Sequence, residues 1–238
     1  MVFNGGISVS EGLAYGKAHL YIHCKNQIEH VLVNKDDVAS EIGIFSSTLE
    51  SLIEKDKALV YKNEQEKSLI DMNIAMLSDP ELKAKVEMMI SAKLYNAPWA
   101  VSVVLDEYMS ERVSDFEDVK YKLVSTLLDK CNDISLSEPS ILVADYLLPS
   151  ELLSLDKAKL KAIVVEKGGA TSHIAILSKS LGIPAILAMK NITKEVKNSE
   201  WIIVDGIDGN VISNPNAEQI AYCNERIETK EEEKAELL

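Results

Sequence analysis

The sequence predicts an α/β domain formed by the two ends of the chain and interrupted by an inserted all-α subdomain, a helical bundle. Short runs in which apolar and polar residues alternate, as in strands, occur near the N-terminus and again from Ile141 onward. Between Asp36 and about Lys130, apolar residues recur every three or four positions, the spacing of one helix face. The resulting assignment is a discontinuous α/β domain over 1–31 and 141–216, a helical insert over 32–140, and a linker helix over 217–238.

Alternation in the N-terminal segment begins after a turn at Gly5-Gly6. It puts two sets of side chains on opposite faces of a strand: Ala18, Leu20 and Ile22 on one, and Lys17, His19, Tyr21 and His23 on the other. We expect His19 and His23 to be solvated. Four residues apart on a strand, they lie roughly 13 Å apart, too far to share one metal ion, even with Cys24 adjacent and His30 nearby. The sequence therefore predicts no metal site.

The middle of the chain shows helical spacing in two clear groups. These are Ile42, Phe45, Leu49 and Leu52, and then Leu82, Val86 and Met89. Asp79-Pro80 is typical of a helix start, because an aspartate accepts from first-turn N–H groups and proline suits the first position. Another helix is expected to begin at Asn96-Ala97-Pro98, and the segment from Asp118 to Leu127 continues the helical region.

The last third of the chain returns to short strands and helices. Strands are expected over 141–144, 162–165, 185–188 and 201–204, and helices near 150–155, over 174–181 and over 217–238. The segment from Asp205 to Gly209 predicts a hairpin turn. Its two aspartates lack the twelve-residue ligand pattern of a calcium loop.

Composition and charge exclude several classes of protein. With 38 acidic and 25 basic residues the net charge is −13, which disfavours nucleic acid as a partner. We find no signal peptide and no apolar run long enough to cross a bilayer, so we expect a cytoplasmic protein without a membrane partner. Cys24, Cys131 and Cys223 are odd in number and lack CxxC spacing, which indicates free thiols in a reducing compartment.

The run from Glu166 to Ile176 carries the strongest chemical signal. Its order is strand, glycine turn, hydroxyl cap and helix, with His173 at the helix start. The first turn of a helix offers unpaired N–H groups and the positive end of the dipole, which suit a phosphate. A histidine there can attack phosphorus while backbone donors stabilise the phosphoryl oxygens. The spacing alone leaves open that His173 is an ordinary surface residue.

The same run resembles a known signature. Gly168 to Ile176, followed by Leu181-Gly182-Ile183-Pro184-Ala185, is similar to the phosphohistidine motif of the phosphoenolpyruvate (PEP)-utilising enzymes. Four other segments resemble, in the right order, the N-terminal half of enzyme I of the bacterial sugar phosphotransferase system: Ile7–Ala18, Met76–Leu82, Glu111–Asp118 and Asp205–Pro215. The resemblance implies an α/β phosphohistidine (swivelling) domain whose helical insert docks the phosphocarrier protein HPr.

The resemblance also implies roles for single residues. His173 would carry the phosphoryl group and exchange it with HPr. Gly168 and Gly169 would let the backbone approach the phosphate, and Thr171 and Ser172 would cap the helix and offer hydroxyls, with capping alone as the alternative. The implied contacts with HPr are Met76, Asp79, Glu81, Leu82 and Arg112, for which core packing, capping and solvation are the alternatives.

In the family a C-terminal barrel binds PEP and Mg²⁺, and dimerisation is attributed to it. We expect no such barrel within these 238 residues. We therefore expect the phosphohistidine step of a phosphoenolpyruvate-protein phosphotransferase without use of PEP by this chain, no cofactor of its own, and a monomer, or a dimer where the C-terminal domain exists.

Several positions depart from the family pattern. Leu152 stands where a threonine usually hydrogen-bonds the active imidazole, and Lys179 stands where arginine is usual. Glu11 replaces a proline, and Asp71-Met72-Asn73 replaces an acid-small-His run. Two alternatives stay open: a catalytically weakened module that only binds an HPr-like carrier, and the swivelling domain of a dikinase-type enzyme. The second fits the N-terminal location and the helical insert poorly.

Overall fold

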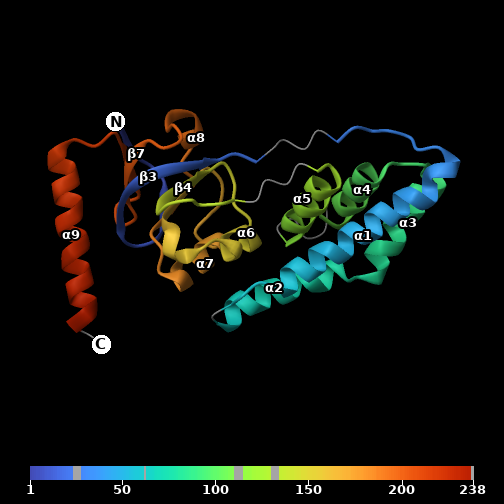
Figure 1. The fold of residues 1–238 in the computed structure, drawn as a ribbon, viewed down its shortest axis with the longest axis horizontal. Helices are drawn as coiled ribbons and strands as arrows, with labels where there is room; N and C mark the ends of the chain where they lie inside the picture. Colours follow the sequence, from blue (N-terminus) through green and yellow to red (C-terminus); the bar gives the residue numbers. More distant parts are fainter. Residues whose placement is uncertain (24–27, 62, 110–114, 130–133, 237–238) are drawn as a thin grey trace. The chain divides into compact units, whose positions relative to one another are not determined.

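The computed structural model describes residues 1–23, 28–61, 63–109, 115–129 and 134–236, with the backbone alone at Asp115 and over 230–236 (Figure 1). The chain forms two compact units, an α/β unit of Met1–His23 with Asp133–Leu238 and a helical unit of Cys24–Asn132. The α/β unit is thus built from both ends of the chain, and the expected fold class is confirmed.

The boundaries between the units lie at 23/24 and 132/133, whereas the sequence assignment put them at 31/32 and 140/141. Backbone pairing explains the first difference. The Val33 N–H donates to the Leu94 carbonyl at 2.8 Å, and the Asn96 N–H donates to the Val31 carbonyl at 3.0 Å. These bonds attach the segment after residue 28 to the helical unit.

In the described residues the α/β unit has one mixed sheet with the strand order β1-β8-β7-β3-β4-β5-β6-β2. The four neighbours from β3 to β6 are parallel, and the strands that flank them are antiparallel. Strands β4 and β5 are almost entirely buried, as parallel strands covered on both faces are. The strands are β1 (Val2–Phe3), β2 (Ile7–Ser10), β3 (Leu13–Tyr21), β4 (Ser140–Ala144), β5 (Leu160–Val165), β6 (Ala185–Leu187), β7 (Trp201–Asp205) and β8 (Asn210–Ser213).

Helices cover both faces of this sheet. Helix α8 packs on β4, α9 on β3, and α7 on β2 and β6; Figure 1 shows α8 on one side of the sheet and α6 with α7 on the other. Ile141 and Val143 of β4 share a core cluster with Ile192 of α8, so alternate residues of that strand face α6 and α7. The helices are α6 (Pro149–Ser154), α7 (His173–Leu181), α8 (Ile192–Glu195) and α9 (Ala217–Glu236), with a 3₁₀ turn η2 (Lys157–Lys159).

The predicted hairpin joins β7 to β8. Asp205 pairs with Asn210, and the Asp205 Oδ1 accepts from the N–H groups of Ile207 at 2.9 Å and Asp208 at 3.1 Å. The carboxylate therefore closes the turn, and the expectation of a hairpin is confirmed.

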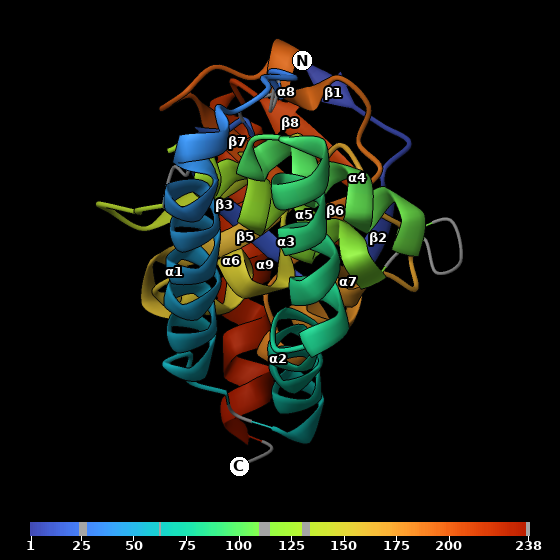
Figure 2. The same cartoon turned by 90° about the vertical axis from the view of Figure 1, so that its right-hand side faces the viewer.

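The helical unit packs its helices around one apolar core, and Figure 2 looks onto this unit with α1 and α3 side by side. The expected start of α3 is confirmed: Asp79 Oδ1 accepts from the Glu81 N–H at 2.8 Å and Pro80 is the first helical residue. A buried ion pair joins Lys122 Nζ to Asp56 Oδ1 at 2.7 Å. The elements are η1 (Lys35–Asp37), α1 (Val38–Lys57), α2 (Glu64–Leu77), α3 (Pro80–Lys93), α4 (Ala97–Met109) and α5 (Asp115–Leu127).

Two further expectations from the sequence concern membrane-spanning segments and the state of the cysteines. None of the helices in the described residues combines the length and the apolar character needed to cross a membrane. Cys223 of α9 is a free, buried thiol whose pKa is raised by burial and by the charge of Asp205. Cys24 and Cys131 lie outside the described residues.

Candidate active site

The His173 site begins where β5 ends and a loop over residues 166–172 leads into α7. His173 is the first residue of that helix, and Ser172 is its N-cap. The Ser172 Oγ accepts from the Ala175 N–H at 3.3 Å, and the Ser172 N–H donates to the Gly169 carbonyl at 3.0 Å. Thr171 is exposed and has no hydrogen-bond partner among the described residues. Capping is therefore done by Ser172, and the Thr171 hydroxyl is left to solvent.

The two loop glycines, Gly168 and Gly169, differ in whether another residue could replace them. Gly168 has φ +111°, in the left-handed region, and a Cβ there would lie 3.2 Å from Leu187 Cδ1. A Cβ on Gly169 would meet nothing within 4 Å. The sharp turn into the site thus depends on Gly168, while Gly169 leaves open space above the loop.

The His173 side chain is half-buried and has no hydrogen-bond partner among the described residues. Within the same residues, the backbone N–H groups of His173 and Ile174 also lack acceptors, as expected for a first helical turn. The imidazole and two unpaired donors therefore share the positive end of α7. This arrangement can receive a phosphoryl group.

Leu152 contributes nothing polar to this site. It is fully buried, on α6, which packs against α7. Lys179, the other departure near the histidine, is exposed in the last turn of α7. The ring of His173 consequently has no hydroxyl from this position to orient it.

The start of the loop is tied to its surroundings by backbone and side-chain bonds. The Glu166 N–H donates to the Ala144 carbonyl at 3.0 Å, and the Lys167 N–H donates to the Asp145 carbonyl at 3.2 Å. The Glu166 carboxylate accepts from the Thr193 N–H at 2.9 Å. The position of the loop therefore depends on the end of β4 and on α8.

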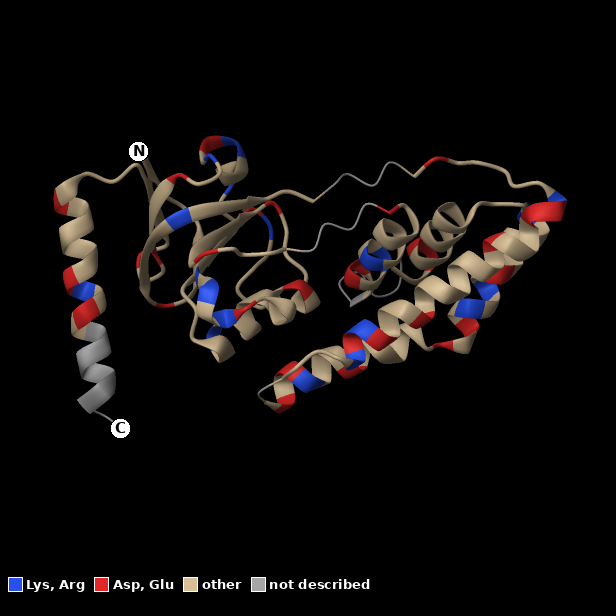
Figure 3. Ribbon diagram, in the orientation of Figure 1, with Lys and Arg blue, Asp and Glu red and all other residues tan. Residues whose placement is uncertain are grey.

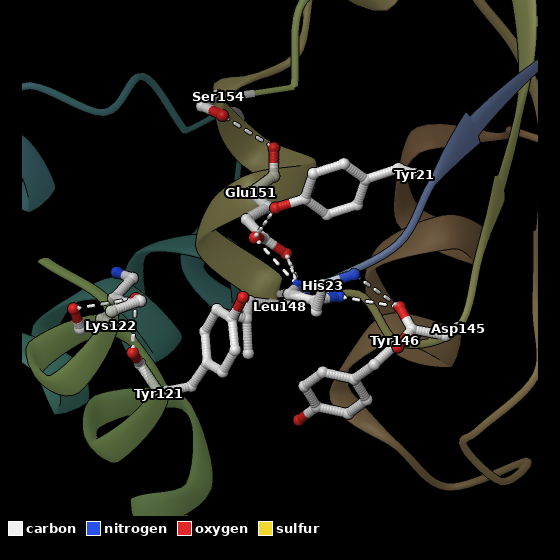
Figure 4. Close-up of polar contacts among 10 residues, drawn as sticks. Tyr21, His23, Tyr121, Lys122, Asp145, Tyr146, Leu148, Glu151 and Ser154 are labelled. Atoms are coloured by element: carbon white, nitrogen blue, oxygen red, sulfur yellow. Dashed lines mark hydrogen bonds and ion pairs between the residues drawn. The ribbon is translucent and has the colours of Figure 1, made fainter. Parts of the chain in front are cut away.

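Beside this loop lies a charged cluster that the sequence did not reveal, formed by Tyr21, His23, Asp145 and Glu151 and called here the His23 cluster. Figure 4 shows the His23 ring between the two carboxylates, with Nδ1 3.0 Å from Asp145 Oδ1 and Nε2 3.1 Å from Glu151 Oε1. The expectation of a solvated His23 is wrong, since the residue is 8% exposed. Strand β3 ends at Tyr21, so the alternation that placed His23 on the outer face no longer applies.

The rest of the His23 cluster completes a network of hydrogen bonds (Figure 4). The Tyr21 hydroxyl donates to Glu151 Oε1 at 3.0 Å, and the Leu148 N–H donates to Glu151 Oε2 at 2.8 Å. The His23 and Tyr146 N–H groups both donate to Asp145 Oδ1, at 3.0 and 2.9 Å. Together these bonds fix both carboxylates.

Charge in the His23 cluster is set by this network. Burial disfavours a protonated His23, but its hydrogen bonds to Asp145 and Glu151 and their negative charges outweigh it and raise the His23 pKa to about 9. Burial alone would raise the pKa of Asp145, but the hydrogen bonds and charge of His23 lower it. At neutral pH the cluster is an imidazolium between two carboxylates. His19, by contrast, is half-buried with a pKa lowered by burial.

The residues expected to meet HPr lie in different surroundings. Met76 is half-buried and packs against the helical core, Asp79 caps α3, and Glu81 is exposed and pairs with Lys85 at 3.0 Å. Leu82 is 3% exposed and belongs to the core, so its expected role as a contact is corrected: the side chain is not available to a partner. Arg112 lies outside the described residues. Figure 3 shows acidic and basic residues interspersed along these helices.

Two family models match the chain. The PEP-utilising enzyme N-terminal model matches residues 5–118, and the PEP-utilising enzyme mobile-domain model matches residues 136–209. The second match contains the His173 loop and both carboxylates of the His23 cluster.

Individual relatives agree with these models. Phosphoenolpyruvate-protein phosphotransferase of Listeria monocytogenes serovar 1/2a is 35% identical over 236 residues, which cover 91% of this chain and 41% of that protein. The enzyme of the same name from Streptococcus equinus is 33% identical, over 97% of this chain and 43% of its own length. The chain therefore spans about two fifths of these relatives.

The solution structure of an Enzyme I protein (nEIt) aligns with a TM-score of 0.81 and 33% identity, covering 97% of this chain and all of the other. The N-terminal domain of Enzyme 1-Nitrogen aligns with a TM-score of 0.62 and 22% identity, which shows the fold alone. The chain belongs to the phosphoenolpyruvate-protein phosphotransferase (Enzyme I) family of PEP-utilising enzymes and corresponds to the N-terminal part of its members.

Proposed function

We propose that His173 accepts a phosphoryl group from the phosphocarrier protein HPr and returns it, in the cytoplasm. The observation that carries this proposal is the half-buried His173 ring without a hydrogen-bond partner among the described residues, beside the unpaired N–H groups of His173 and Ile174. Family membership supports the same role, since the motif from Gly168 to His173 is complete.

The chemistry is a direct transfer between two imidazoles. One ring nitrogen of His173 attacks the phosphorus of the carrier's phosphohistidine. A new P–N bond forms while the old one breaks, and its electron pair returns to the carrier's ring. The unpaired N–H groups at the start of α7 donate to the phosphoryl oxygens as charge develops on them. The same kind of bond is made and broken, so transfer runs in both directions.

No cofactor from this chain enters the step as proposed. By resemblance, PEP and Mg²⁺ belong to a C-terminal part of the family's proteins, which corresponds to residues beyond the aligned two fifths of the relatives. We accordingly propose that these residues do not turn over PEP. We also propose that they form a monomer in solution.

For the contact with HPr we propose the turn between α2 and α3. Asp79 and Glu81 present carboxylates there, and Met76 presents a partly exposed apolar side chain. Leu82 is left out because it is buried. Neutralising Glu81 with Glu81→Gln is expected to weaken binding of HPr, measured by titration calorimetry, whereas Glu87→Gln on the same helix serves as the matched control.

A second candidate function follows from Leu152. Because this residue is apolar and fully buried, His173 has no hydroxyl partner of the kind that the family usually provides. Transfer could then be too slow to matter, and the chain would act by binding the carrier.

Intact-mass analysis separates the two candidates. The chain is mixed with phosphorylated HPr, beside a His173→Ala variant and a sample given PEP and Mg²⁺ alone. A gain of one acid-labile phosphoryl group, absent from both controls, is expected. No gain despite measurable binding of HPr would overturn phosphotransfer in favour of a binding module. Labelling by PEP alone would contradict the assignment of PEP use to other residues.

A further inference from the structure

We infer that His23 is a positioning residue for the His173 site: its ring bridges Asp145 and Glu151 and so fixes the segment that holds both the loop 166–172 and helix α6. This inference rests on the proposed function for its effect on phosphotransfer, while its structural part stands on the geometry alone.

The bridge closes a short segment of chain on itself. Asp145 follows β4 directly and Glu151 lies in α6, so the ring contacts both ends of the connection between strand and helix. Each carboxylate also accepts an N–H from within the connection, Asp145 from Tyr146 and Glu151 from Leu148. The conformation of 145–151 is therefore determined by two carboxylates whose common partner is His23.

That segment is joined to the His173 site at two places. Its first residue, Asp145, accepts the Lys167 N–H through its carbonyl, which places the start of the loop. Its last residue, Glu151, is part of α6, which packs against α7, the helix that begins with His173. A change in the bridge is thus transmitted to His173 both through the loop and through the neighbouring helix.

The charge on the ring is what makes the bridge strong. In the described part of the α/β unit, the groups that face it include two carboxylates, Asp145 and Glu151, and two phenols, Tyr21 and Tyr146. Without a cation between them, the two carboxylates would be partly buried and mutually repulsive, with side chains 28% and 18% exposed. The Tyr21 hydroxyl, being neutral, satisfies one oxygen of Glu151 but leaves that repulsion in place.

His23 is also the last residue of the N-terminal part of the α/β unit before the chain enters the helical unit. Strand β3 ends two residues earlier, at Tyr21, so the ladder with β4 no longer holds the chain here. Beyond the end of β3, the hydrogen bonds of His23 hold this part of the chain against residues 145–151.

The test compares His23→Gln with His23→Lys, which keeps a cation, and with His19→Gln as matched control. His19 lies on β3, four residues before His23, and its side chain has no hydrogen-bond or ion-pair partner among the described residues. At pH 7, amide hydrogen exchange of Lys167 and Tyr146 is expected to be at least tenfold faster in His23→Gln, unchanged in His19→Gln, and partly restored in His23→Lys. Unchanged protection in a folded His23→Gln variant would overturn the inference.

Phosphoryl exchange with phosphorylated HPr provides the functional readout. The maximal rate of His23→Gln is expected to fall about tenfold while the HPr concentration at half-maximal rate stays the same, because the docking residues are untouched. A fall in apparent affinity with an unchanged maximal rate would contradict a positioning role. If the wild type takes up no phosphoryl group, the proposed function fails, and the exchange of Lys167 still tests the bridge separately.

The wild type supplies a version of the test that needs no variant. When ring signals are followed by NMR, His23 is expected to titrate near pH 9, and the ring signals of His173 are expected to move with that same midpoint. Titration of His23 near 6.5, or His173 signals that ignore the His23 transition, would overturn the inference even if His23→Gln did not fold.

Discussion

Because of the bridging His23, we expect the free energy of unfolding of the α/β unit to decrease as the pH rises into the alkaline range. The native pKa of His23, about 9, lies above its unfolded value of about 6.5. Below pH 6.5 both states hold the proton and the stabilisation is complete. Between 6.5 and 9 only the folded state holds it, so the free energy of unfolding decreases as the pH rises. Above pH 9 neither the folded nor the unfolded state holds the proton, and the stabilisation by protonated His23 is lost.

The size of the effect follows from the pKa difference. At 1.36 kcal/mol per pKa unit, a rise from 6.5 to about 9 corresponds to about 3 kcal/mol. Asp145 is partly exposed, with a side chain 28% accessible, and water there screens the pair. We therefore expect a loss of about 2 kcal/mol between pH 6.5 and pH 10.

Urea unfolding can isolate this contribution. The chain has two tryptophans, Trp201 in the α/β unit and Trp99 in the helical unit, so a Trp99→Phe background makes fluorescence report on Trp201. Unfolding free energies are measured at pH 6.5, 8, 9 and 10 with and without His23→Gln. Other groups that titrate in this range are common to both proteins, so their effects cancel in the difference.

We expect the difference in unfolding free energy between the two proteins to be largest at pH 6.5 and close to zero at pH 10. A difference that stays constant over the whole range would refute it, because the histidine would then stabilise the unit by packing alone. A difference that grows with pH would mean that the sign of the pKa change is wrong.

Substitutions at three further places test the loop, the core and the helix cap by urea unfolding. Gly168→Ala is expected to cost about 1–2 kcal/mol, because φ is +111° there, and Gly169→Ala less than about 0.5 kcal/mol; the opposite ranking would contradict the loop geometry. Leu152→Ala is expected to cost about 3 kcal/mol, and a loss below about 1 kcal/mol would mean that Leu152 is not well packed. Asp79→Ala is expected to cost the helical unit about 1 kcal/mol and Asp79→Asn much less, so equal losses would remove the capping explanation.

Local patterns in the sequence were sufficient for the secondary structure around the site. The order of strand, glycine turn and hydroxyl before His173 corresponds to β5, the loop and the Ser172 cap. The Asp79-Pro80 pair likewise gives the start of α3. These features depend on residues a few positions apart, which is the range over which propensity and capping act.

The residues of the His23 cluster are far apart in the sequence, so no local pattern predicts that they meet. His23 meets Asp145 and Glu151, which follow it by 122 and 128 residues. Alternation predicts a face only as long as the strand continues, and β3 stops at Tyr21. In the sequence, a histidine two residues beyond a strand is indistinguishable from one on its outer face.

The same limit applies to the surface expected to meet HPr. Met76 and Leu82 are both apolar residues at helical spacing, yet Leu82 is buried and Met76 is half-buried. Sequence spacing indicates which side chains share a helix face. It does not tell which part of that face the neighbouring helices cover.

A sheet assembled from both ends of the chain imposes an order on synthesis and folding. Lys17 of β3 pairs with Ser140, 123 residues later, and Val2 pairs with Ile212. A ribosome must therefore synthesise the chain as far as Ser213 before the sheet can close, whereas every described helix of Cys24–Asn132 is complete long before that. The helical unit can fold first, which converts a long flexible connection into a structured one and lowers the entropy cost of pairing β3 with β4.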